Sequence, residues 1–142
     1  MGRKIVLGLD GSAGSLVAAE WCADIAKALE AEVIAVHGLS LQAYPYYWMP
    51  VPTIDETWHK ELQAVMEHDW CKPLEDHGIP FRAQIVEDEP AQAIMTVADR
   101  EQPDLVVVGR RGRGTFAEAL LGSVSHRLVH QAHHPVVIVP RA

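Results

Sequence analysis

Glycines and arginines alternate in the segment 109–115, which reads Gly-Arg-Arg-Gly-Arg-Gly-Thr and is followed at 122–125 by Gly-Ser-Val-Ser. Glycines let a backbone approach an anion closely, and consecutive amide N–H groups or a helix N-terminus supply partial positive charge. Residues 109–127 include four arginines and one acid, Glu118, for a local charge of +3. The segment therefore predicts a phosphate site. It is equally typical of a turn whose arginines are solvated.

A second candidate follows the first apolar run of the chain, where Asp10, Gly11 and Ser12 are consecutive. A carboxylate at this place could contact phosphates or a Mg²⁺ ion. Asp and Ser are also the residues that cap helices and close turns, and both roles can hold together.

Several histidines are candidate metal ligands. His126 and His130 are one helical turn apart, but no Cys, Asp or Glu completes a set beside them in the sequence. Solvent-facing positions explain them better, as they do His133 and His134 near the predicted end of that helix. His37, at the end of a predicted strand, is interpreted as a half-buried histidine with satisfied hydrogen bonds.

The composition bounds the class of protein. The chain has 142 residues, 12 Lys+Arg and 19 Asp+Glu, so its net charge is −7, and 49% of its residues are hydrophobic. These values predict one globular domain over residues 1–142 and argue against general nucleic-acid binding. No apolar run reaches the roughly 18 to 20 residues that span a membrane, and we expect a cytoplasmic protein. Cys22 and Cys71 are expected to be buried and unpaired.

Hydrophobic patterns then place the elements that position these residues. Unbroken runs rich in Val, Ile and Leu predict strands at 4–9, 32–39, 81–86, 104–109 and 135–140. Helical periodicity predicts helices over 15–30, from the capping box Thr53/Glu56 onwards, over 89–101, and from the capping box Thr115/Glu118 to about His133. Pro73 should kink or end the second helix, with a continuation up to Gly78. Residues 40–53 are an aromatic, proline-rich loop that covers a pocket, an interface or simply the surface.

This order predicts an α/β fold: a doubly wound, five-stranded parallel sheet with helices on both faces, Rossmann-like, with strand order 3-2-1-4-5. Ligands of such sheets bind outside the carboxyl ends of the strands, at the switch point. That rule directs attention to the loops after the first and fourth strands, which carry the two glycine-rich segments.

The glycine spacing carries a family resemblance. Gly109-x2-Gly112-x9-Gly122-Ser123 is similar to the G-2x-G-9x-G-S/T motif in the ATP-binding branch of the universal stress protein (UspA-like) family. The resemblance covers the whole chain, including Asp10-Gly11-Ser12, the strand that ends at Val36-His37, and the closing Pro135–Val139 run. It implies nucleotide binding in a stress-response or regulatory module.

The resemblance also implies roles for particular residues. In the family, the aspartate after strand one lies near the ribose, the phosphates or their metal, the end of strand two faces the adenine, and the motif surrounds ribose and phosphates. Carried over to this chain, the cofactor-binding residues are Leu9, Asp10, Gly38, Val108, Gly109, Arg111, Gly112, Gly122, Ser123, Val124 and Ser125, with Asp10 as the metal ligand. The chain departs from the common pattern by having arginines at 110, 111 and 113, which leaves the identity of the nucleotide open.

The leading hypothesis is thus a module that binds ATP, or another adenine nucleotide, with or without Mg²⁺. No nucleophile–base pair is evident, so catalytic residues are not assigned and any ATP hydrolysis should be slow. The alternatives are an ATP-hydrolysing or nucleotidyl-transfer enzyme on a related α/β fold and a nucleotide-free dimeric interaction scaffold. The apolar last strand is a pairing liability if it lies at a sheet edge, and together with the resemblance it predicts a homodimer through Val136–Val139.

Overall fold

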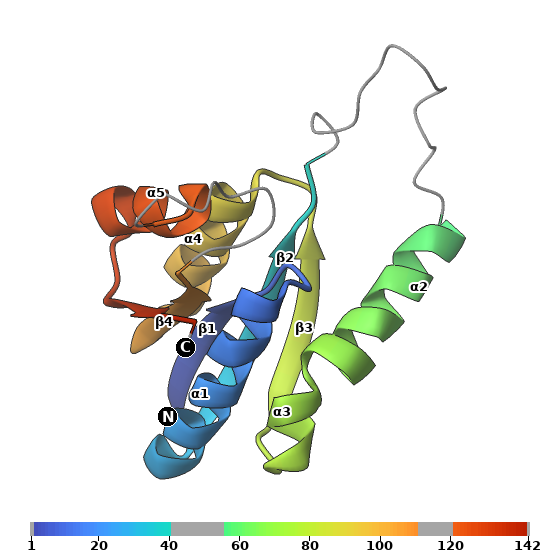
Figure 1. Ribbon diagram of the computed structural model, residues 1–142, viewed down its shortest axis with the longest axis horizontal. Helices are drawn as coiled ribbons and strands as arrows, with labels where there is room; N and C mark the ends of the chain where they lie inside the picture. Colours follow the sequence, from blue (N-terminus) through green and yellow to red (C-terminus); the bar gives the residue numbers. More distant parts are fainter. Residues whose placement is uncertain (1, 41–55, 111–120, 142) are drawn as a thin grey trace.

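Five parallel strands form one sheet in a computed structural model that describes residues 2–40, 56–110 and 121–141 (Figure 1). The strand order β3-β2-β1-β4-β5 confirms the predicted α/β topology. β1 occupies the centre and pairs with β2 on one side and β4 on the other, so the chain changes direction across the sheet between β1 and β4. The strands are β1 (Arg3–Gly8), β2 (Ala31–Gly38), β3 (Phe81–Val86), β4 (Leu105–Gly109) and β5 (Val136–Val139).

Helices cover both faces of this sheet (Figure 1). On one face α1 packs against β1, β4 and α3, and on the other α4 packs against β1, β2 and α5. Each face of the sheet has its own hydrophobic core, and alternate residues of β1 pack into one or the other. Ile5 and Leu7 belong to the core on the α1 face, and Val6 belongs to the core on the α4 face. The helical elements are α1 (Ala13–Leu29), α2 (Glu56–Val65), the π-helix η2 (Met66–Trp70), α3 (Lys72–Asp76), α4 (Pro90–Glu101) and α5 (Ser123–Gln131). None of the described helices is long and apolar enough to cross a membrane.

The second helix is interrupted differently from the prediction. Pro73 does not itself end a helix, because it occupies the first turn of α3, where its missing N–H is tolerated. The α-helical pattern ends earlier, at Val65, and η2 follows, with the Cys71 N–H donating to the carbonyl of Met66 at 3.0 Å. A proline at 73 has no N–H to donate to the residue four positions earlier, so the helix is already disturbed in the preceding turn.

The last helix also begins later than predicted. Gly122 is extended (φ −70°, ψ 168°) and is the N-cap of α5, which runs only to Gln131. An uninterrupted helix from Thr115 to His133 is therefore wrong, because Gly122 breaks it. The capping residues Thr53 and Thr115 and most of the 40–53 loop lie outside the described residues.

The two cysteines are free and buried, as predicted. Cys22 lies on α1 and Cys71 follows η2, and both belong to the core between α1 and the sheet. Burial raises the pKa of each thiol to about 12. Both therefore behave as small apolar residues in the folded protein.

Candidate functional site

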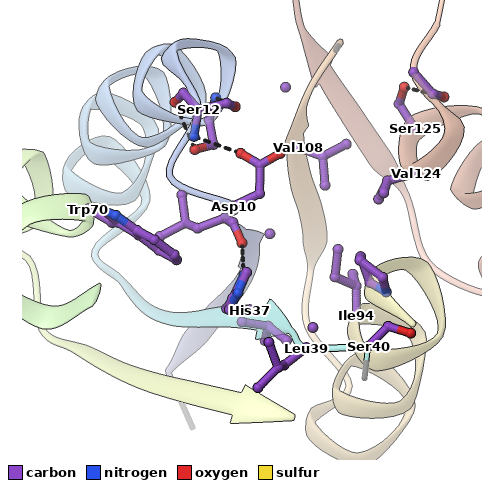
Figure 2. A pocket seen from close by; sticks show the side chains of 18 of the residues that line it. Asp10, Ser12, His37, Leu39, Ser40, Trp70, Ile94, Val108, Val124 and Ser125 are labelled. Carbon is purple, nitrogen blue, oxygen red and sulfur yellow. Dashed lines mark hydrogen bonds between the residues drawn. The ribbon is translucent and has the colours of Figure 1, made fainter. Parts of the chain in front are cut away.

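A cavity of about 620 Å³ opens at the carboxyl ends of β1, β2 and β4, where the topology changes direction. Figure 2 shows the turn after β1 in the middle of this site, with His37 and Trp70 on one side of Asp10 and Val124 and Ser125 on the other. Nine of the residues predicted for the site line the cavity: Leu9, Asp10, Gly38, Val108, Gly109, Gly122, Ser123, Val124 and Ser125. Arg111 and Gly112, and the neighbouring Arg113, lie outside the described residues.

The β1–α1 turn holds Asp10 at the cavity. Its Oδ1 accepts the N–H of Ser12 at 2.9 Å, and Gly11 between them has φ 78°, a conformation that favours glycine. The N-cap of α1 is Ser12, whose hydroxyl accepts the N–H of Ser15 at 3.2 Å. Asp10 is therefore a turn residue rather than the cap, while its side chain lines the same cavity as the start of α5.

The N-terminus of α5 also opens on this cavity. Gly122 as N-cap has no side chain to accept the first-turn amides, and no side-chain cap is found for this helix within the described part of the chain. The N–H of Gly122 donates to the carbonyl of Arg110 at 2.7 Å, which returns the chain to the end of β4. The first-turn amides of Ser123, Val124 and Ser125 are the orphan donors of an uncapped helix, a common setting for an anion.

The hydroxyl of Ser125 is engaged within the protein. Only 2% of the residue is exposed, and its Oγ donates to the carbonyl of Arg110 at 2.8 Å, with the Gly122 carbonyl at 3.1 Å. The single hydroxyl proton is thus used in hydrogen bonds to these two backbone carbonyls and is not available to a ligand. Ser125 fastens α5 to the end of β4, and its backbone amide is the group left for a ligand.

Close packing explains why two of the predicted site residues are glycines. A Cβ on Gly109 would lie 2.7 Å from the carbonyl oxygen of Gly14 in α1, and a Cβ on Gly38 would lie 2.5 Å from the Cα of Pro90 in α4. Any larger residue would push against backbone at the start of a helix. The glycines therefore bring the N-termini of α1 and α4 close to the strand ends, which shapes the cavity.

The prediction for His37 is confirmed, and the residue also has a place in the site. Its Nδ1 donates to the carbonyl of Leu9 at 2.9 Å, and its ring meets that of Trp70 edge to face, with centroids 4.9 Å apart. Trp70, together with Trp58 and Leu62 of α2, lines the cavity. Sequence reasoning missed these three residues, because apolar side chains in a predicted helix give no signal for a ligand.

The remaining histidines lie away from the cavity. His126 and His130 are in ring contact on α5, with centroids 4.6 Å apart, while His133 and His134 contact Asp99 of α4 at 3.2 and 3.3 Å. The hydrogen bond from His133 holds the pKa of Asp99 below its usual range. No group of three or more His, Cys, Asp or Glu side chains within residues 2–40, 56–110 and 121–141 could hold a metal ion.

These features define a doubly wound α/β protein with a cavity at the switch point of its sheet and an uncapped helix N-terminus facing that cavity. The chain belongs to the universal stress protein family, whose family model matches residues 1–140.

Individual relatives support this membership. The universal stress protein MJ0531 of Methanocaldococcus jannaschii is 33% identical over 143 residues, which cover 98% of this chain and 82% of the relative. By contrast, the chain spans about half the length of its mycobacterial relatives, for example 46% of Rv2623 from Mycobacterium tuberculosis. Among solved structures, protein MJ0577 is 26% identical with a TM-score of 0.82, covering 100% of this chain and 98% of that one. A universal stress protein in complex with cAMP is also 26% identical, with a TM-score of 0.74 over 98% of this chain and 97% of that one.

Proposed function

We propose that this chain binds ATP, or another adenine nucleotide, in the cavity at the ends of β1, β2 and β4, and that occupancy regulates its association with other proteins in a stress response. The observation that carries the proposal is the uncapped first turn of α5, which opens on a cavity whose other walls are largely apolar. A nucleotide has the matching shape, with an anionic end and a planar apolar end. The similar universal stress protein in complex with cAMP supports the same ligand class.

The motif and the cavity suggest how the nucleotide would lie. The amides of the α5 first turn, with Arg111 and Gly112 of the motif, would receive the phosphates. Val108 and Gly109 would border the ribose, and Leu9 and the backbone of Gly38 would flank the base. Ser125 would take part through its amide, since its hydroxyl donates to the Arg110 carbonyl.

Mg²⁺ fits this cavity only together with phosphates. Asp10 is the only carboxylate among the described residues that line it, and one of its oxygens accepts the Ser12 N–H. Mg²⁺ sites built on one carboxylate draw their other ligands from substrate phosphates and water. We therefore propose that Asp10 holds the ion of a bound Mg·ATP complex, and that the ion would screen charge between the phosphates.

Fast chemistry is not expected at this site. Among the described lining residues, His37 is the only imidazole, and its Nδ1 donates to the Leu9 carbonyl on the floor of the cavity. A general base would need a neighbouring nucleophile or a positioned water and a partner that orients it. We propose that hydrolysis, if measured, is slow compared with nucleotide exchange.

Two measurements test the proposal. Small molecules released by denaturing the purified protein are identified by mass spectrometry, and ATP, AMP and cyclic nucleotides are titrated by calorimetry into wild type, Gly122→Val and Gly2→Val. A β-branched side chain at 122 projects from the cap of α5 and should abolish binding, while Gly2 has nothing within 4 Å and is the matched control. The proposal is supported if wild type and Gly2→Val bind an adenine nucleotide and Gly122→Val does not. If wild type releases no nucleotide and gives no binding heat, the proposal is refuted. The alternatives are then an enzyme that acts on another substrate and a nucleotide-free scaffold.

We further propose that the protein works as a homodimer in the cytoplasm. β5 pairs only with β4 among the described strands, and Val136, Val137 and Ile138 remain partly exposed. The β4–β5 bonds use the carbonyls of Pro135 and Val139, so Val136 and Ile138 direct their backbone groups outward. Sedimentation equilibrium should give a dimer for wild type and a monomer for Ile138→Lys, because edge lysines oppose strand pairing.

A further inference from the structure

The cavity has two chemically different ends. The open first turn of α5 lies at one end, and the rings of His37 and Trp70 lie at the other. Figure 2 shows Trp70 and Val124 on opposite sides of the β1–α1 turn. The two ends also belong to different faces of the sheet, since Trp70 packs on the α1 side and Val124 on the α4 side. A ligand that fills the cavity therefore has to extend across the carboxyl ends of the strands, from one face of the sheet to the other.

The π-helix determines where Trp70 lies. The Cys71 N–H donates to the carbonyl of Met66, five residues earlier, so this turn contains one residue more than an α-helical turn. One extra residue rotates the following side chains by about 100° around the helix axis. Trp70 is the last residue of η2 and is half-buried, which leaves part of its ring accessible in the cavity wall. Single π-turns inside helices frequently occur at functional sites.

His37 fixes the orientation of the Trp70 ring. The two rings meet edge to face at 4.9 Å with an interplanar angle of 80°. His37 is itself held by its Nδ1, which donates to the carbonyl of Leu9 at 2.9 Å. A carbonyl oxygen can only accept, so Nδ1 carries the proton of this bond. Trp70 is thereby connected through His37 to the turn that positions Asp10.

From this arrangement we infer that Trp70 stacks on the base of the bound nucleotide and that His37 is the positioning residue that holds Trp70 for it. The inference rests on the proposed nucleotide site and adds a residue outside the glycine motif. With the phosphates at α5, the base is the only planar apolar part of the ligand left for the aromatic end of the cavity. Stacking on tryptophan accepts any base, because every base has a π-face, so selectivity among bases has to come from the backbone at the end of β2.

The test compares ATP with inorganic triphosphate, which has the phosphates but no base. Trp70→Leu should raise the Kd for ATP roughly tenfold or more, as expected for a lost base–aromatic stack, and leave the Kd for triphosphate unchanged. Trp70→Phe should restore most of the ATP affinity. Trp21 packs on the same core but does not line the cavity, so Trp21→Leu is the matched control and should leave both constants unchanged. Circular dichroism checks that each variant is folded.

Fluorescence separates a stack from a merely structural effect. ATP, but not triphosphate, should quench the emission of wild type. Trp70→Phe should lower that quenching to what Trp58 in the cavity wall contributes, while Trp21→Phe keeps it. His37→Leu removes both the ring contact with Trp70 and the bond to the Leu9 carbonyl, and it should weaken ATP binding while leaving triphosphate binding unchanged.

Equal ATP affinity in wild type and Trp70→Leu would overturn this inference and leave the nucleotide site intact. A parallel loss of ATP and triphosphate affinity would also overturn it, since it would mean that Trp70 only supports the fold of the cavity. Failure of wild type to bind either ligand would refute the nucleotide site itself, and the stacking role with it.

Discussion

Replacing Gly109 with alanine tests how closely β4 packs against α1. The added Cβ would lie 2.7 Å from the carbonyl oxygen and 2.9 Å from the carbonyl carbon of Gly14. An ordinary van der Waals contact begins near 3.4 Å, so the strand end and the helix must separate by about 0.7 Å. Both contacting atoms are backbone atoms in the first turn of α1, and no flexible side chain can move aside to accept the methyl group.

The expected cost follows from two opposing terms. Overpacking of this kind destabilises a protein by about 1–3 kcal/mol, and we expect the upper half of that range because backbone has to move. Gly109 does not have a positive φ, so alanine also removes conformational freedom from the unfolded chain, which offsets about 0.4–1 kcal/mol. The net loss should be about 1–2.6 kcal/mol, which lowers the Tm by roughly 3–9 °C in a domain of this size.

Urea unfolding followed by circular dichroism measures this loss, with Gly2→Ala as the matched control. Gly2 has nothing within 4 Å, so its variant should remain within about 0.5 kcal/mol of wild type. A Gly109→Ala protein as stable as Gly2→Ala would refute the reasoning, because it would show that the strand end and α1 are not in the close contact described.

Three further outcomes are expected. Met66→Ala should lower the free energy of unfolding by about 2–5 kcal/mol in urea titrations, because Met66 is fully buried where η2 begins. Ser12→Ala should cost about 0.5–2 kcal/mol through loss of the α1 N-cap, measured in the same way. Cys22 and Cys71 should resist a thiol reagent at pH 8 in the folded protein and react in urea, because their pKa of about 12 exceeds the unfolded value near 8.5. The same difference means that their contribution to stability is present below about pH 8.5 and is lost as the pH rises towards 12, which pH-dependent unfolding curves would show.

The fold was predictable because its signals are local and repeated. Buried parallel strands require unbroken apolar runs, and residues such as Ile5, Leu7 and Val107 provide them with almost no competing pattern. Helix starts were predictable where a side chain or a proline marks them, as Ser12 does for α1 and Pro90 for α4. The position of the cavity followed from the topology, because the loops after β1 and β4 meet at the switch point.

The unpredicted parts depend on contacts between distant segments. The position of the π-turn beside Trp70 was only partly predictable, because Pro73 signals a disturbed helix while the burial of Met66 and Leu74 against α1 depends on distant contacts. The late start of α5 has a similar origin. Gly122 donates its N–H to the Arg110 carbonyl, twelve residues earlier, and its extended conformation excludes a continuous helix through this position.

The glycines of the motif are therefore not all explained by ligand binding. Gly109 is required by the approach of α1 whether or not a nucleotide binds, so a larger residue there changes stability and binding together. Gly122 caps α5 in an extended conformation open to any residue, and Trp70 stands in the wall of the cavity without belonging to the motif. Substitutions at these last two positions can change binding while the fold persists. The function of this chain is consequently better tested at 122 and 70 than at the first glycine of the motif.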